Sequence, residues 1–443
     1  MLWVDAICIN QSDTRERNHQ VGLMRSVYRG AQDVVAWRGE ATDDSDLAMD
    51  YLASGTWLSS PVVTASEDLL QILGRLCSRP YWSRVWVVQE LAMASQITFH
   101  CGYKSLHWEV LAEFLKKRFD FKHPTRTYFR QPRSLLRLAR GEQKELLVTL
   151  REAAEFETSI PADKVYGLLG LFPQAIQDIL VPDYAKSFPS LLYELLQAYI
   201  SVAKDVEFLC AFPRLTDSKP STPCPSWLPD IRERVGGLGE WYNPAGRPWD
   251  AVVSLHDGTL TVPGVFIGRL GSTLGPFETK KDVLVENFFR HGRMLLGGAS
   301  FSGLKHTALE YLQRRRPDAS LEELETLFFN MVSGERIHSL FENPGLVSRH
   351  DMWRLVTGVE THGSIEGFAK VSDYFQGIFQ RLDERVLFTT TNDFVGIGPA
   401  DAREGDIVCI LSGCRLPIVL REQEGDDGRH FHVFVGPSYV DGS

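Results

Sequence analysis

Residues 79–91, RPYWSRVWVVQEL, place two tryptophans, a tyrosine and three valines around a single carboxylate, Glu90. Trp86 and Glu90 are four residues apart, a spacing that puts two side chains on the same face of a helix. The spacing therefore predicts that the Glu90 carboxylate lies beside an indole and is partly withdrawn from water. Such withdrawal gives a carboxyl group an unusual pKa, which makes Glu90 a candidate functional residue.

A structural role is the alternative for Glu90. Arg79 and Arg84 are placed to reach its carboxylate, and pairing with arginine is the common fate of a half-buried glutamate. Taken alone, the residues favour this structural role and leave the catalytic one open.

The segments around this stretch alternate between strand and helix patterns. Residues 2–9, LWVDAICI, are predicted as a buried strand, residues 14–30 as a helix and residues 33–39 as a second strand. This order predicts a βαβ unit and a partly parallel sheet, so the fold class is α/β. A core strand that begins at residue 2 also predicts a sheet that is incomplete at its amino-terminal side. Further helices are expected at 45–58, 67–76, 81–94 and 106–119, and a third strand at 97–101.

The rest of the chain is expected to form three further regions. Residues 116–212 are predicted as a helical region after a first domain at 1–115. Residues 213–250 are rich in proline, glycine and tryptophan, and we expect a linker there. Residues 251–443 are predicted as a β-rich domain, in which a hairpin at 251–271 joins the late strands in a small β-barrel. A helical insertion is expected at about 278–382.

The composition is that of an ordinary globular protein, with 44% hydrophobic and 23% charged residues. A net charge of −10 argues against a general nucleic-acid or anionic-membrane binder. No apolar run is long enough to span a bilayer, and no secretory leader is seen. The seven cysteines lack CxxC spacing and are expected to be reduced, mostly buried thiols of a cytosolic or nuclear protein, and we predict a cytoplasmic location. Cys8, at the end of a predicted strand, could be a nucleophile, but a small buried thiol is favoured.

One segment departs from this acidic balance. Residues 116–140 interleave lysines and arginines with aromatic residues, a composition that can bind single-stranded nucleic acid. A solvated helix face is the alternative, and the overall charge favours it. We therefore expect no sequence-specific nucleic-acid partner.

Motifs for metal and nucleotide chemistry are absent or incomplete. No HExxH is present, and His430 and His432 on one strand face are expected to be an exposed pair. The segment GASFSGLK at 298–305 has Leu304 where a phosphate loop needs lysine, and GIG at 396–398 lacks the third glycine of a dinucleotide fingerprint. We therefore expect neither a metal nor a resident cofactor.

Two blocks resemble the fungal heterokaryon incompatibility (HET) domain. The first is LWVDAICINQSDTRERNHQVGLMRSVYRGAQDVVAWRGE at the start of the chain, and the second is RPYWSRVWVVQELAMASQITFHCG from residue 79. HET domains begin with an earlier strand that has no counterpart here. Segments similar to those that accompany HET domains follow later: ADKVYGLLGL and VPDY within 162–184, CPSWLPD at 224–230 and LFTTTNDFVGIGPADAREGDIVCIL at 387–411.

This resemblance implies nonself recognition between fungal strains, with the HET domain as an effector of programmed cell death. HET domains are remotely similar to Toll/interleukin-1 receptor (TIR) domains of flavodoxin-like fold, some of which cleave NAD at the nicotinamide glycosidic bond. That likeness implies Glu90 as the catalytic carboxylate, with Trp86, Trp37, Asp5 and Ser83 as substrate-binding residues and NAD as substrate. A carboxylate can stabilise the oxocarbenium-like state of such a cleavage.

The alternative is a different class of function. In it the chain is a non-enzymatic interaction or assembly module, or an inactive fragment, and Glu90 is structural. In either case the expected partner is a protein, in nonself recognition or in self-association.

Overall fold

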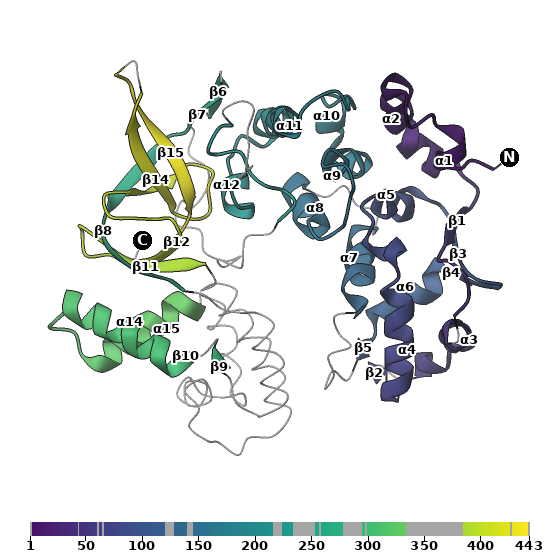
Figure 1. Cartoon of the computed structure of the whole chain (residues 1–443), viewed down its shortest axis with the longest axis horizontal. Coiled ribbons are helices and arrows are strands. Elements are labelled where there is room, and N and C mark those ends of the chain that lie inside the picture. Colours follow the sequence, from purple (N-terminus) through teal and green to yellow (C-terminus); the bar gives the residue numbers. More distant parts are fainter. Residues whose placement is uncertain are drawn as a thin grey trace. The chain divides into compact units, whose positions relative to one another are not determined.

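The computed structural model describes residues 2–42, 44–59, 62–63, 66–119, 128–139, 145–215, 224–233, 253–256, 258–277, 295–296, 299–333, 384–425 and 428–441 (Figure 1). The chain divides into two compact units. The first comprises residues 1–203 and 231–234, and the second residues 204–230 and 235–443. The expected linker at 213–250 and the expected insertion at 278–382 lie mostly outside the described residues.

The first unit is built around a three-stranded sheet with the order β1-β3-β4. Strand β1 (Val34–Trp37) pairs in parallel with β3 (Ile97–Cys101), and β3 pairs antiparallel with β4 (Lys104–His107). Between β1 and β3 the chain forms α3 (Ser45–Ser54), α4 (Glu67–Cys77) and α5 (Trp86–Met93). The parallel pair confirms an α/β unit. A flavodoxin-like sheet of parallel strands is not seen among the described residues.

The expected strand at residues 2–9 is wrong. Residues Asp5–Cys8 form a short helix, α1, whose backbone bonds are local: the Cys8 amide donates to the Val4 carbonyl at 2.8 Å. The apolar run is not buried either, since Leu2 is 79% exposed and Ile7 is 82% exposed. The sequence pattern of an apolar, β-branched run is the same whether or not a neighbouring strand is present to pair with it, so the pattern alone does not predict pairing.

Helix α2 (Thr14–Gly30) agrees with its prediction. The Asp13 side chain caps it by accepting from the Arg15 and Glu16 amides, and Val21, Met24 and Tyr28 form its buried face. Strand β3 and helix α4 also agree with their predictions, whereas the other elements are shorter than expected or newly seen. They include the 3₁₀ turns η1 (Thr56–Ser59), η2 (Pro80–Ser83) and η4 (Leu169–Leu171), the two-residue strands β2 (Val62–Val63) and β5 (Arg118–Phe119), and helix α6 (Trp108–Lys116).

One face of the β1-β3-β4 sheet is buried and the other is open. Val34 and Ala36 alternate along β1 with Val35 and Trp37, as the two-residue period of a strand requires. The first two are buried, whereas Val35 is 56% exposed and Trp37 is 51% exposed. Helices α3 and α6 pack on this sheet, so the core of the unit lies between them and the buried face.

Five helices complete the first unit, in agreement with the helical pattern of the sequence. They are α7 (Arg130–Leu138), α8 (Leu146–Ala153), α9 (Asp163–Tyr166), α10 (Gln174–Gln177) and α11 (Phe188–Ala203). Lys164 fixes the C-terminal end of α8, because its buried ammonium group donates to the carbonyls of Ala154, at 2.7 Å, and Phe156.

The second unit contains a seven-stranded antiparallel sheet with the order β15-β14-β13-β8-β11-β12-β16. Its strands are β8 (Gly264–Phe277), β11 (Arg385–Thr390), β12 (Val395–Pro399), β13 (Ile407–Leu411), β14 (Ile418–Glu424), β15 (His430–Pro437) and β16 (Tyr439–Val440). Long strand β8 pairs with β13 through its first half and with β11 through its second half. The late part of the chain is therefore rich in β-strands, as predicted.

The sheet curls, because its two edge strands are successive in the chain. Only Ser438 separates β15 from β16, although they stand at opposite ends of the strand order. Buried Arg385 supports this corner by donating to the Pro437 carbonyl at 2.9 Å. No pairing that would close the curl into a barrel is found among the described strands, so the expected closed barrel is not seen.

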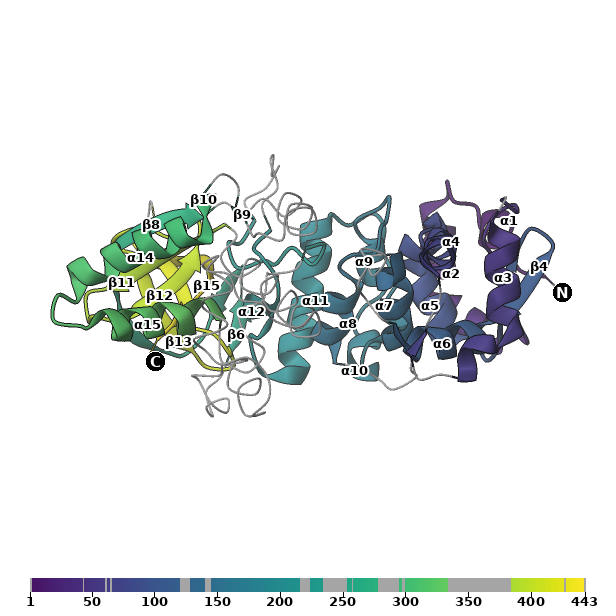
Figure 2. The same ribbon diagram turned by 90° about the horizontal axis from the view of Figure 1, so that it is seen from below.

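The expected hairpin at residues 251–271 is only partly right. Strands β6 (Ser254–His256) and β7 (Thr259–Thr261) pair with each other, and the strand that joins the late sheet is β8. Helices α14 (Phe301–Arg315) and α15 (Leu321–Ser333) pack together beside the sheet (Figure 2). The Tyr311 hydroxyl of α14 donates to the Ser272 carbonyl of β8 at 2.9 Å. The remaining short elements are α12 (Phe208–Ala211), β9 (Leu295–Leu296) and β10 (Ala299–Ser300). Among the described helices, none has the length and hydropathy to cross a membrane.

Candidate functional site

A pocket of about 540 Å³ lies in the first unit. It is lined by both charged and aromatic side chains, a mixture that is typical of ligand sites. Those that matter for its chemistry are three acids, two arginines and two rings: Asp5, Glu157, Asp163, Arg17, Arg84, Trp86 and Tyr184.

The wall that carries Trp86 is fixed by backbone bonds to a distant segment. The Val85 amide donates to the Glu157 carbonyl at 3.0 Å, and the Glu157 amide donates to the Ser83 carbonyl at 2.5 Å. The Ser83 hydroxyl adds a bond to the Glu157 carboxylate at 3.2 Å. Trp82, just before, is buried and donates its indole N–H to the Leu76 carbonyl. The residues that lead into α5 are therefore fixed by hydrogen bonds to Glu157 and to the Leu76 carbonyl.

A second part of the lining consists of Arg17, Tyr184 and Asp163, which contact one another. The Arg17 guanidinium carbon lies 3.9 Å from the centroid of the Tyr184 ring. The Tyr184 hydroxyl donates to buried Asp163 at 2.5 Å, and the Thr158 hydroxyl donates to the other oxygen of that carboxylate at 3.2 Å. Burial, and then the charge of Asp163, raises the pKa of the Tyr184 hydroxyl well above its ordinary value.

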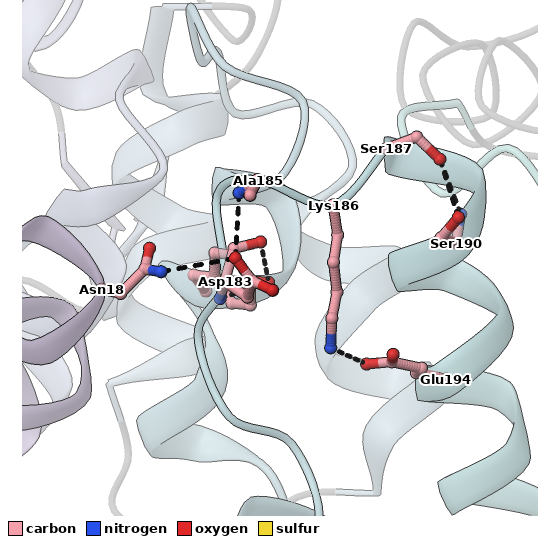
Figure 3. Close-up of polar contacts among 8 residues, drawn as sticks. Asn18, Asp183, Ala185, Lys186, Ser187, Ser190 and Glu194 are labelled. Carbon is pink, nitrogen blue, oxygen red and sulfur yellow. Dashed lines mark hydrogen bonds and ion pairs between the residues drawn. The ribbon is translucent and has the colours of Figure 1, made fainter. Parts of the chain in front are cut away.

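The segment that carries Tyr184 docks directly on helix α2. Asn18 of α2 makes two bonds to it: its side-chain amide donates to Asp183 at 3.4 Å (Figure 3), and its side-chain oxygen accepts from the Tyr184 amide at 2.9 Å. The Tyr166 hydroxyl both donates to the Asp183 carbonyl and accepts from the Asp183 amide. These bonds bring two sequence blocks more than a hundred residues apart into one site.

Glu90 lies close to this pocket without being one of its lining residues. Its carboxylate accepts from the Tyr81 hydroxyl at 2.9 Å. Burial raises the pKa of Glu90, and the Tyr81 bond and the charge of Arg84 act in the opposite direction. The expected hydrogen bond from Arg79 or Arg84 is therefore wrong. The Arg79 guanidinium donates instead to the carbonyls of Arg38 and Glu40, at 2.8 and 3.0 Å.

The sequence did not single out Arg38, which lies among three aromatic rings, one of them that of Tyr81. Its guanidinium carbon is 3.1 Å from the Trp82 ring centroid, 4.0 Å from that of Phe99 and 4.1 Å from that of Tyr81. Arg38 is 6% exposed, and its guanidinium nitrogens have no hydrogen-bond partner within the described residues. Burial lowers the pKa of Arg38 to about 9.

The structure separates the five predicted site residues. Trp86 and Asp5 line the pocket, Ser83 bonds to Glu157 beside it, and Glu90 bonds to Tyr81. Trp37 lies on the open face of β1 and does not line the pocket. The residues that sequence reasoning missed are Arg17, Asp163 and Tyr184. Their only sequence signal was that they belong to the blocks on which the family resemblance rests.

Two other expectations have outcomes here. Cys8 is exposed, so its assignment as a buried thiol is wrong. Several cations of the basic segment are paired with acids, as expected of a solvated helix face. The pairs are Lys116 with Glu113, Arg130 with Glu155 and Arg137 with Glu152. Residues 120–127 of that segment lie outside the described residues.

Comparison with known proteins identifies the family. Residues 1–90 match the family model described as heterokaryon incompatibility protein (HET), and residues 359–443 match the Het-6 beta-barrel domain. The chain is a HET-domain protein. It aligns over 100% of its length, and over 80% of the relative's length, with heterokaryon incompatibility protein 6, OR allele, of Neurospora crassa, at 24% identity. No solved structure matches it.

The pocket of this HET-domain protein extends beyond the segment that matches the HET family model. Asp5, Arg17 and Trp86 lie within residues 1–90, whereas Asp163 and Tyr184 lie outside them. The HET segment therefore forms only part of the pocket, and residues 157–163 together with Tyr184 complete it.

Proposed function

We propose that this HET-domain protein acts in the cytoplasm in nonself recognition between fungal strains, and that its first unit is a protein-interaction module whose engagement triggers cell death. The matches to both family models and the alignment with heterokaryon incompatibility protein 6 support this proposal. The partner is a protein, either a nonself factor or a second copy of the chain.

One observation carries the choice of an interaction module over an enzyme. The Glu90 carboxylate accepts a hydrogen bond from the Tyr81 hydroxyl, and Glu90 is not among the residues that line the pocket. A catalytic carboxylate has to reach the reacting atoms. In this proposal Glu90 is structural, and the exposed side chains around the pocket make the contacts.

A second candidate function is hydrolysis of the glycosidic bond of NAD. The observation that favours it is electrostatic: burial raises the pKa of Glu90, and Trp86, one helical turn earlier on α5, does line the pocket. Rotation of the Glu90 side chain away from Tyr81 would then present a carboxylate to a sugar ring stacked near Trp86. Such a carboxylate would stabilise an oxocarbenium-like state.

The two functions separate in one experiment on the full chain. The wild type, Glu90→Gln, Trp86→Ala and the control Glu109→Gln are expressed in fungal cells, and growth and cellular NAD are measured together. Glu109 is an exposed glutamate on α6, so its variant controls for the loss of one charge. We expect Glu90→Gln to arrest growth as the wild type does, at constant NAD, and Trp86→Ala to be impaired. Loss of both killing and NAD consumption in folded Glu90→Gln would instead establish the enzyme.

A further inference from the structure

A cluster outside the pocket brings two thiols together in the second unit. Cys210 on α12 and Cys414 in the turn after β13 lie with Glu207 in a group whose Sγ and carboxylate oxygen atoms are within 4.8 Å of one another. The two cysteines are 7% and 1% exposed. Burial, and then a hydrogen bond with the Cys414 thiol, raises the pKa of Cys210.

The backbone around these thiols is in direct contact. The Val206 amide donates to the Gly413 carbonyl at 3.1 Å. Gly413 has φ +72°, and a Cβ at this position would lie only 2.9 Å from the Cα of Asp205. These contacts hold the segment that precedes Cys210 against the residue before Cys414, and a disulfide between the two thiols needs their Cα atoms to be roughly 4.4–6.8 Å apart.

A metal ion is the less suitable occupant of this cluster. The Glu207 carboxylate accepts from the Arg415 amide at 2.9 Å and from the Arg415 Nε at 2.6 Å, so its oxygens are already engaged. Without Glu207 only the two thiols remain in the group, whereas a structural zinc site uses four ligands. The geometry therefore favours a covalent link between the sulfurs.

We propose that Cys210 and Cys414 are an oxidisable pair that forms a disulfide when the protein meets hydrogen peroxide. The sulfur of Cys210, the more exposed of the two, attacks a peroxide oxygen; the O–O bond breaks, one water leaves and a sulfenic acid remains. The sulfur of Cys414 then attacks that of Cys210, the S–O bond breaks, and the hydroxide takes the thiol proton to leave as a second water. The two thiols lose two electrons in total, and the peroxide gains them.

The disulfide would link two segments roughly 200 residues apart in the chain. Closing so long a loop restricts the unfolded chain strongly, so the oxidised second unit is expected to unfold at a higher temperature than the reduced one. The reaction is expected to be slow, because burial raises the pKa of the Cys210 thiol and few of its molecules are therefore thiolates. The disulfide would therefore accumulate during sustained exposure to peroxide and not during brief exposure.

The test uses the purified full chain. It is treated with hydrogen peroxide, blocked with N-ethylmaleimide, digested with trypsin without reductant and analysed by mass spectrometry. Residues 205–214 carry Cys210 alone, whereas residues 404–415 carry both Cys409 and Cys414. Cys409→Ala is therefore the matched control, since it removes a buried thiol of the same peptide that lies outside the group.

We expect a cross-link between these two peptides in the wild type and in Cys409→Ala, and its loss in Cys210→Ala and in Cys414→Ala. In the wild type, fragment ions that separate Cys409 from Cys414 show which of these two cysteines is linked to Cys210, without any variant. A bond between Cys409 and Cys414, or no bond once exposed Cys8 is fully oxidised, would overturn the proposal. So would one equivalent of zinc bound by the reduced wild type and lost in Cys210→Ala.

Discussion

Replacing Gly413 with alanine should loosen the contact between the two segments that hold Cys210 and Cys414. Gly413 has φ +72°, so an alanine there adopts a left-handed backbone at a cost of about 1–2 kcal/mol. The new Cβ would also lie 2.8 Å from the Asp205 Cβ and 3.3 Å from the Val206 nitrogen. Overpacking of this kind costs about 1–3 kcal/mol.

Gly405→Ala is the matched control. Gly405 has φ +88°, and a Cβ there would meet no atom within 4 Å, so the control carries the backbone cost alone. The two variants should therefore differ by about 1–3 kcal/mol. Because about 1.4 kcal/mol is a factor of ten, this difference corresponds to a roughly 5- to 150-fold change in local opening.

Hydrogen exchange of residues 205–214, followed by mass spectrometry, measures that opening directly. The segment is held to Gly413 by the bond from the Val206 amide, so the amides that follow Val206 should lose protection when this contact opens. We expect faster exchange in Gly413→Ala than in Gly405→Ala by the factor above. Equal protection of the peptide in both variants would show that the close approach at position 413 does not hold the segments together.

Three further outcomes are expected in the first unit. Tyr184→Phe removes a bond to buried Asp163 and should cost about 1.5–3 kcal/mol in urea unfolding, whereas Tyr103→Phe, at a fully exposed site, should be neutral. Burial raises the pKa of Glu90 in the folded state above its usual value of 4.5. The contribution of Glu90 to the free energy of unfolding is therefore full below pH 4.5 and is lost as the pH rises through the folded pKa. Thermal unfolding measured across this pH range should show that loss in the wild type and not in Glu90→Gln. Lys164→Met removes the donor from two buried backbone carbonyls and should lower the free energy of unfolding by about 1–3 kcal/mol in the same urea assay, and an unchanged midpoint would contradict the capping role.

The regular elements of this protein were predictable where the pattern is strong and locally determined. Helix α2 follows from apolar residues at three-and-four spacing with Asp13 as its cap, and both are seen. The late strands follow from short β-branched runs between turns. The run at residues 2–9 has an equally strong pattern, but whether it pairs depends on a neighbouring strand, which a local pattern does not specify.

The pocket was less predictable than the fold, because its walls meet only in three dimensions. Arg17 and Tyr184 are in van der Waals contact although they are far apart in the chain. The spacing of Trp86 and Glu90 predicted a carboxylate withdrawn from water, and burial does raise its pKa. The same spacing carried no information about Tyr81, which supplies the hydrogen bond in place of an arginine.

Tyr81 links a buried cation to a partly buried carboxylate, and this arrangement decides how variants of Glu90 should be interpreted. Its ring faces the Arg38 guanidinium, and its hydroxyl donates to Glu90. Burial is the largest influence on the pKa of both charged groups, so removing either charge leaves the other less compensated. Glu90→Ala would remove the hydrogen-bond acceptor together with the charge, and loss of function would then reflect disrupted packing as readily as lost catalysis. Glu90→Gln keeps an acceptor for Tyr81 and removes only the charge, so it alone separates a structural carboxylate from a reactive one.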